Sequence, residues 1–317
     1  MNEIGGYIEL DTYDRPMLHE KAIALNCGRN ALAYVLRSRG IKRLLVPRLI
    51  CNSGINVCRR ENVDVVLYSV GKDFFPAEEV RISDEEWLYI VNYYSQISNN
   101  QLEKLKEKHK RIIVDNAQSY FQAPIGGVDT LYTCRKYFGV SDGAFLYTTV
   151  KSDESYAVDE SYQRMGFLLG RYEREASRFY AEYVHNNELM EFEPIKCMSK
   201  LTRNLLHGVN YESIQNVRES NYIILHRALD GVNELTLSTT PGTYMYPLLV
   251  KNGEQVRKKL QEKKIYIPIL WPEVMERCAE DRIERSLAAN VLPLPIDQRY
   301  GKNEMDYIIK EVLESIS

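Results

Sequence analysis

The sequence predicts an α/β protein with a mainly parallel sheet covered by helices, followed by a smaller C-terminal α+β unit. Six short runs are apolar on both faces and rich in Val, Ile, Leu and Tyr, at 42–47, 63–70, 86–94, 111–114, 130–133 and 144–149. Polar helical stretches such as 99–109 lie between them. Strands buried on both faces and joined by helices are typical of parallel sheets with helices on either side.

The composition is that of an ordinary globular protein. The chain has 317 residues, of which 44% are hydrophobic and 27% charged, and a formal net charge of -3. These values exclude a disordered chain and predict no partner with an anionic surface, neither nucleic acid nor membrane. The basic run at 104–111 includes Glu107 and is interpreted as the solvated face of a helix.

The cysteines and the N-terminal residues indicate the cellular compartment of the protein. The six cysteines form no C-x-x-C pair and have no His at metal-ligand spacing, which indicates reduced thiols and no metal site. The N-terminus is acidic, and no apolar run approaches the roughly 18 residues that a membrane-spanning helix needs. The sequence therefore predicts a cytoplasmic protein.

The N-terminal part predicts a short strand at 6–10 and then a helix that follows a glycine turn. Residues 1–18 are expected to pack on a distant part of the fold, for which the C-terminal unit is one candidate. Gly28, Arg29 and Asn30 precede an amphipathic pattern that ends near Gly40. A helix start of this kind presents free N–H groups to an anion such as phosphate, although many helices begin in this way with nothing bound.

The second half changes character twice. Residues 162–190 are polar, rich in Tyr and Arg and helical in pattern, and they suit either a subunit interface or a helix packed on its own domain. Beyond Gly231, strand patterns at 233–239, 243–250, 264–270 and 290–296 alternate with helical ones at 253–263, 279–289 and 302–316. We therefore expect a large domain at 19–230 and a small one at 231–317, which share an interface rather than a flexible tether.

Three polar residues follow two of the predicted strands and define a site hypothesis. Asp115 and Gln118 come after the strand at 111–114, and Lys136 comes after the strand at 130–133. In open α/β sheets, functional groups lie just beyond the carboxyl ends of the strands. The alternatives are a turn formed by Asp115 and a surface position for Lys136.

An ordered set of motifs carries a family resemblance. The segments GRNALAYVL, VDNAQ, PIGGVD, RKYFG followed by DGA, and LWP followed by LPLPID resemble the DegT/DnrJ/StrS family of pyridoxal-phosphate-dependent sugar aminotransferases, in order from about Gly28 to Ile308. The resemblance implies the fold type I architecture of aspartate aminotransferase, pyridoxal 5'-phosphate as cofactor and a homodimer with shared active sites. It also implies transfer of an amino group from an amino acid, usually glutamate, to a keto sugar that is normally nucleotide-linked, in polysaccharide or amino-sugar biosynthesis.

The resemblance also assigns roles to individual residues. Lys136 matches the lysine that binds the cofactor covalently and moves protons, and Asp115 matches the carboxylate that pairs with the cofactor's ring nitrogen. Gln118 matches the residue that meets the phenolic oxygen. The cofactor phosphate is expected at the turn formed by Gly28, Arg29 and Asn30, with Thr133 as the nearest hydroxyl.

Several positions depart from the family pattern. Cys51 stands where many members place an aromatic ring over the cofactor, which leaves Tyr93 or Tyr94 as candidate substitutes. Leu131 stands at the position of a serine that binds phosphate, and the segment that usually comes from the partner subunit offers only Ser199 and Asn204. The alternatives are therefore a non-catalytic or regulatory member, or an enzyme for a non-sugar substrate.

Overall fold

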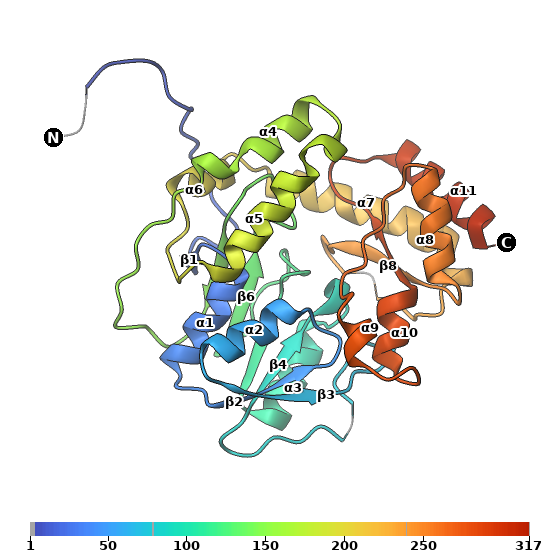
Figure 1. Cartoon of the computed structure of the whole chain (residues 1–317), viewed down its shortest axis with the longest axis horizontal. Coiled ribbons are helices and arrows are strands. Elements are labelled where there is room, and N and C mark those ends of the chain that lie inside the picture. Colours follow the sequence, from blue (N-terminus) through green and yellow to red (C-terminus); the bar gives the residue numbers. More distant parts are fainter. Residues whose placement is uncertain (1–3, 78, 239, 317) are drawn as a thin grey trace.

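The protein is built on a seven-stranded sheet. The computed structural model describes residues 4–77, 79–238 and 240–316. Within them the strand order of the large sheet is β1-β7-β6-β5-β4-β2-β3 (Figure 1). The strands are β1 (Ile23–Leu25), β2 (Arg43–Pro47), β3 (Asp64–Tyr68), β4 (Trp87–Val91), β5 (Ile112–Asp115), β6 (Asp129–Thr133) and β7 (Ala144–Tyr147).

The pairing confirms the predicted α/β class. The β2 strand pairs in parallel with β3 and β4, β4 with β5, and β5 with β6, whereas β7 and β1 add an antiparallel edge. The six predicted runs all form strands of this sheet. The β1 strand was not predicted, because its three residues directly precede the glycine turn and are too few to form a pattern.

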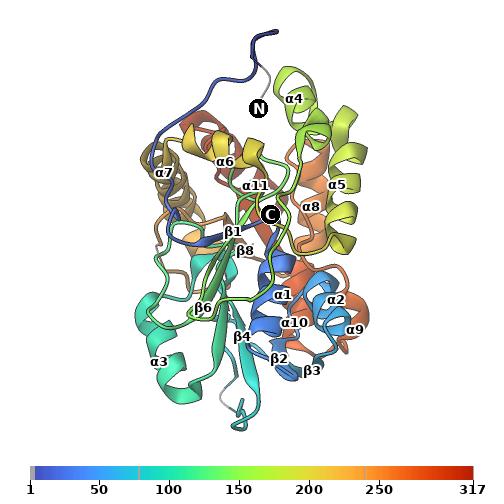
Figure 2. The ribbon, with the colours of Figure 1, turned by 90° about the vertical axis from the view of Figure 1, so that its left-hand side faces the viewer.

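Helices cover both faces of the sheet. In Figure 2 the sheet lies between α3 (Asn99–His109) on one side and α1 (Gly28–Ser38) and α2 (Asn52–Arg60) on the other. The α1 helix forms where the sequence predicts it and is buried from Asn30 to Leu36. After the sheet the chain forms α4 (Gly166–Glu173), α5 (Tyr180–Phe192), α6 (Lys200–His207) and α7 (Tyr211–Leu229).

The α3 helix has a capping box at its start. Ser98 Oγ accepts the N–H of Gln101, and Gln101 Oε1 accepts the N–H of Ser98. We expect Ser98→Ala to lower the free energy of unfolding by about 1 kcal/mol, because N-terminal N–H groups lose an acceptor. Urea unfolding measures the change, with Asn100→Ala on the same first turn as control. An equal loss in both variants would contradict the role of the cap.

The N-terminal segment bonds to α6. The N–H of Tyr13 donates to Asn204 Oδ1 at 2.9 Å, and the N–H of Arg15 donates to the carbonyl oxygen of His207 at 3.1 Å. Residues 6–10 form no strand, and the segment projects from the body in Figures 1 and 2. These contacts place the segment against the large unit rather than the C-terminal one, because acceptors on α6 bind its backbone N–H groups.

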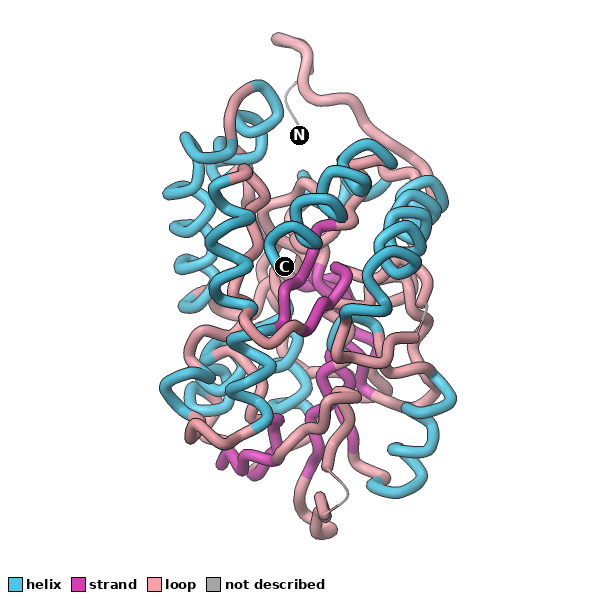
Figure 3. Tube along the Cα trace, turned by 90° about the vertical axis from the view of Figure 1, so that its right-hand side faces the viewer, coloured by secondary structure: helices cyan, strands magenta, loops and turns pink. Residues whose placement is uncertain are grey.

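The C-terminal unit contains two paired strands, β8 (Met245–Leu249) and β9 (Val291–Pro295). Figure 3 views the molecule from the side of this unit and shows its helices in front of the strands. These helices are α8 (Gly253–Glu262), α9 (Val274–Arg277), α10 (Ile283–Asn290) and α11 (Lys302–Ile316). The core of this unit includes Tyr222, Leu225 and Leu229. We therefore propose that the smaller unit begins within α7 rather than at residue 231.

Two of the predicted C-terminal strands do not form among the described residues. At 233–238, Asn233 Oδ1 accepts the N–H groups of Leu235 and Leu249, at 3.1 and 2.9 Å, in place of a regular ladder. At 264–270, Lys264 has a φ of 61° and Pro268 lacks an N–H, and the segment runs as a loop.

The two units meet along a hydrogen-bonded contact that we call the seam. Gln96 and Ser238 exchange two hydrogen bonds, from Gln96 Nε2 at 3.2 Å and from the N–H of Ser238 at 2.8 Å. Thr243 Oγ1 donates to the carbonyl oxygen of Tyr94 at 2.5 Å. These bonds, with apolar side chains of α9 and α10 in the main core, agree with the expected shared interface. In the described part of the chain no helix is long and apolar enough to cross a membrane.

Candidate active site

Lys136 lies three residues beyond the end of β6, and its side chain is exposed to solvent. The surrounding protein nevertheless lowers the pKa of its amine, mainly by desolvation, and the charge of Arg135 acts in the same direction. Asp115 and Cys51 oppose this shift, so both lie close enough to act on the amine. Since water still reaches the side chain, desolvation is partial. A lysine with a lowered pKa has more neutral amine, the form that attacks a carbonyl.

Asp115 is the last residue of β5, and two donors fix its carboxylate. Tyr89 Oη donates to Oδ2 at 2.7 Å, and the N–H of Ala117 donates to Oδ1 at 2.8 Å. In the sheet Tyr89 pairs with Ile113, two residues before Asp115, so the side chains of Tyr89 and Asp115 share a face. The sequence analysis missed Tyr89, because only the register of the sheet brings the two together.

Gln118 is buried beside a turn with unusual backbone geometry. Its Oε1 accepts the N–H of Tyr94 at 2.9 Å, and its carbonyl oxygen accepts Ser95 Oγ at 2.8 Å. Tyr94 and Ser95 have φ values of 50° and 59°, a region that side chains rarely adopt. Because the amide oxygen is engaged, the amide NH₂ is the group that Gln118 retains for a ligand.

The start of α1 lies against β6. A Cβ on Gly28 would stand 3.9 Å from both Leu131 Cδ1 and Thr133 Cβ, so these two residues flank the helix start. Cys27, the N-cap residue, makes no side-chain capping bond. The N-terminal N–H groups of α1 therefore remain the anion-binding feature of this place, with Thr133 as a neighbouring hydroxyl.

The side chains of Arg29 and Asn30 bind other residues of the protein. Arg29 donates to the carbonyl oxygen of Asn187 at 3.0 Å and forms an ion pair with Glu191 at 3.1 Å. Asn30 is fully buried, donates to Asn26 Oδ1 and to the carbonyl oxygens of residues 193 and 194, and accepts from Arg60. The predicted cradle at 28–30 therefore rests on backbone N–H groups rather than on these side chains.

The expected substitutes for a stacking ring lie in the core. Tyr93 and Tyr94 are buried, and their rings contact those of Phe74 and Trp271. Cys51 precedes α2, and its Sγ lies 2.8 Å from Ser53 Oγ. The ring that faces the lysine is Tyr244, whose centroid is 5.4 Å from Lys136 Nζ. It comes from the segment before β8, and no sequence motif indicates it.

The two candidates for a partner-derived phosphate ligand are engaged within the chain. Ser199 caps α6, bonds Asp142 through both its N–H and its hydroxyl at 2.8 Å, and lies 2.8 Å from Ser161 Oγ. Asn204 holds the N-terminal segment through Tyr13 and the carbonyl oxygen of Asp11.

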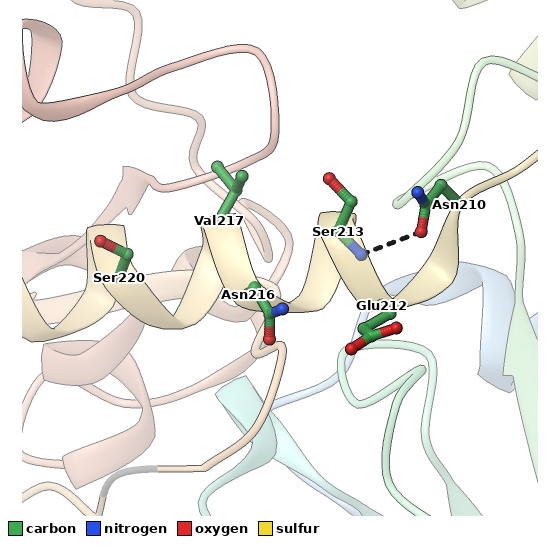
Figure 4. Close-up of a pocket in the computed structure, with 6 residues that line it drawn as sticks. All are labelled: Asn210, Glu212, Ser213, Asn216, Val217 and Ser220. Carbon is green, nitrogen blue, oxygen red and sulfur yellow. Dashed lines mark hydrogen bonds between the residues drawn. The ribbon is translucent and has the colours of Figure 1, made fainter.

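Two surface cavities differ in their relation to this site. One, of about 370 Å³, adjoins the start of α1; its lining residues are Arg29, Tyr180, Tyr183, Val184, Asn187, Glu188, Glu191 and Phe192. The other, of about 410 Å³, runs along one side of α7, as Figure 4 shows; it is lined by Asn210, Glu212, Ser213, Asn216, Val217 and Ser220. Of the predicted site residues, Arg29 lines the first cavity and none lines the α7 cavity.

Solved structures share this fold over nearly the whole chain. The DesV protein of S. venezuelae, solved with a ketimine intermediate, is 18% identical with a TM-score of 0.66, over 92% of this chain and 84% of its own. A DegT DnrJ EryC1 StrS aminotransferase from Brucella abortus is 17% identical with a TM-score of 0.64, over 93% and 86%. Spr1654 from Streptococcus pneumoniae, described as a sugar aminotransferase and solved in a PMP form, is 14% identical with a TM-score of 0.66, over 95% and 90%.

These likenesses confirm the predicted fold type I architecture. No protein-family model matches the sequence, and no curated protein matches it significantly.

Proposed function

We propose that the protein is a pyridoxal-phosphate-dependent aminotransferase that moves an amino group from an amino acid, glutamate being the expected donor, to a keto sugar. The observation that carries the proposal is the position of Asp115 and Lys136 at the carboxyl ends of the neighbouring parallel strands β5 and β6, where the charge of Asp115 acts on the pKa of the Lys136 amine. The shared fold with sugar aminotransferases supports the same conclusion.

The residues present suit this cofactor. The N-terminal N–H groups of α1 and the Thr133 hydroxyl would hold its phosphate, Asp115 its ring nitrogen, Gln118 its phenolic oxygen and Lys136 its aldehyde carbon. When bound, the cofactor supplies an electron sink that lets the substrate's α-carbon lose a proton.

The protein's own contribution is charge and proton movement. In the first half of the reaction the neutral Lys136 Nζ would accept the proton that leaves the donor's α-carbon, and in the second half the protonated Nζ would donate a proton to the acceptor carbon that gains the amino group. The Asp115 carboxylate is held in one orientation, because Tyr89 Oη and the N–H of Ala117 donate to its two oxygens. One lysine performs both proton transfers, so the two halves of the reaction use one site.

An absorbance titration tests the proposal. Purified protein with pyridoxal phosphate should show a visible band of bound cofactor, and glutamate should bleach it; a keto sugar, free or nucleotide-linked, should restore it. A band that glutamate and other amino acids leave unchanged would favour the non-catalytic alternative. Restoration only by non-sugar keto compounds would move the substrate to that class.

Thr133→Val tests the phosphate cradle. The variant keeps the shape and loses the hydroxyl, and we expect the Kd for pyridoxal phosphate to rise about tenfold because one hydrogen bond to a charged group is lost. Fluorescence titration measures the Kd, and pyridoxal, which lacks the phosphate, is the control ligand. A similar loss for both ligands would contradict phosphate contact by Thr133.

The cavity beside Arg29 is the place that we propose for the sugar. Three aromatic residues line it, and tyrosine rings pack on the C–H faces of sugars. Glu188 and Glu191 in its wall accept hydrogen bonds from hydroxyl groups. The ion pair of Arg29 with Glu191 leaves little free positive charge there, so the wall suits the neutral ring more than a diphosphate.

We also propose a cytoplasmic homodimer. Leu169 and Tyr172 on α4 and Phe192 at the end of α5 are 64%, 94% and 85% exposed, and large apolar side chains left exposed on these helices suit a protein interface. All six cysteines are free, which suits a reducing compartment. Sedimentation analysis of wild type and Tyr172→Glu, with a dimer for the first and a monomer for the second, would support this surface as the interface.

A further inference from the structure

Arg218, on α7, is a fully buried cation with an unusual set of partners. It is 1% exposed, and its guanidinium donates to the carbonyl oxygens of Thr243 and Tyr244, at 3.2 and 3.1 Å, and to Gln298 Oε1 at 3.1 Å. It also stands over the ring of Tyr137, with its Cζ 4.6 Å from the centroid. Because a buried charge is costly, such a position requires several compensating contacts, and all of these are on segments next to Lys136.

These contacts converge on the Tyr244 ring. Tyr137 follows Lys136 directly, its ring lies 5.8 Å from that of Tyr244, and its carbonyl oxygen accepts Gln298 Nε2 at 2.7 Å. The Tyr244 backbone is held by Arg218 on one side and, through Thr243, by the carbonyl oxygen of Tyr94 on the other. Burial raises the pKa of the Tyr244 phenol, so it remains neutral and offers the lysine a π face rather than a phenolate.

We propose that Tyr244 is a ring of the Lys136 site that stabilises the charged form of the amine, and that Arg218 is the positioning residue that holds this ring in place. A distance of 5.4 Å from Nζ to the ring centroid lies within the range of cation–π attraction. The inference rests on the proposed function only in naming Lys136 as the reacting lysine, because the attraction itself needs no cofactor.

Other charged and titratable groups surround this pair, and Tyr94 and Tyr137 are among those near the Tyr244 phenol. Asp115, Cys51 and Arg135 act on Lys136. Tyr183, Arg218, Asp297 and Arg299 act on Tyr244. Variants at Tyr244 and Arg218 leave the first set unchanged, so a change in the lysine reports on the ring.

The test measures the pKa of Lys136 in the cofactor-free full-length protein. Competitive labelling with acetic anhydride across pH, with mass spectrometry of the peptide that contains residue 136, gives this pKa directly. Tyr244→Leu keeps an apolar group but removes the ring, and we expect the pKa to fall by about half a unit. Tyr244→Phe keeps the ring and should leave the pKa unchanged. An unchanged pKa in Tyr244→Leu, or an equal fall in both variants, would overturn the proposal for the ring.

The role of Arg218 is tested by a double-mutant cycle. Arg218→Met should lower the lysine pKa as Tyr244→Leu does, and the double variant should show no further fall, because both changes remove one interaction. Additive shifts would overturn the positioning role. If Arg218→Met does not fold, Arg218→Lys, which keeps the charge but loses the fork of donors, takes its place. If the folded wild-type protein does not bind pyridoxal phosphate, the proposed function is contradicted. The inference about Tyr244 and Arg218 is unaffected, because its test uses the cofactor-free protein.

Discussion

Lys136→Ala is expected to abolish covalent attachment of pyridoxal phosphate and to lower the rate of amino transfer by about 10³-fold or more, equivalent to about 4 kcal/mol. The reason is that one amine both binds the cofactor and moves the protons. Borohydride reduction of the loaded protein, followed by peptide mapping, should find the cofactor on Lys136 in wild type and on no lysine in the variant.

Lys251→Ala is the matched control for that experiment. Lys251 is an exposed lysine in the turn before α8, so its loss should change neither attachment nor rate. Cofactor recovered on a different lysine, or turnover retained by Lys136→Ala, would contradict the assignment.

Asp115→Asn is expected to lower kcat/KM by about 10²- to 10³-fold, because a neutral amide cannot hold a positive ring nitrogen. A second effect follows from the same charge. Asp115 raises the pKa of Lys136, so its removal favours the neutral amine and lowers that pKa. The acidic limb of the pH–rate profile should therefore move to lower pH in the variant.

Tyr89→Phe separates the charge of Asp115 from its orientation. The variant loses one hydrogen bond to the carboxylate and keeps the charge, so the expected loss of kcat/KM is about tenfold or less, without the shift of the acidic limb. If Tyr89→Phe equals Asp115→Asn in both measurements, the carboxylate acts through its geometry and not through its charge.

The large sheet could be predicted from the sequence because its strands are buried on both faces. Runs such as 111–114 then carry enough Val and Ile to be distinguished without any tertiary information. The segments that the prediction missed lack this signal. The β1 strand has three residues, and 233–238 has a strand-like pattern whose N–H partner at Leu235 is a side chain, Asn233.

The residues of the candidate site also fall into those that local sequence predicts and those that only tertiary packing brings together. Asp115 and Lys136 follow strands directly, so their position at one edge of the sheet can be predicted locally. Tyr89, Arg218 and Tyr244 reach the site from a neighbouring strand, from α7 and from the C-terminal unit, and only long-range packing brings them there. Arg29 and Asn30 show the reverse error: the sequence predicts anion-binding side chains, but in the structure these side chains bind other parts of the fold.

The seam between the two units holds the smaller one against the sheet. The N–H of Tyr94 binds Gln118 while its carbonyl oxygen binds Thr243, so one residue connects the cofactor side of the sheet to the smaller unit. Together with the paired bonds of Gln96 and Ser238, this contact fixes the smaller unit next to Lys136. Apolar side chains of α9 and α10 in the main core and the bond from the N–H of Val70 to Glu284 attach the smaller unit to the large one at further points. The position of the Tyr244 ring is therefore tied to that of the sheet.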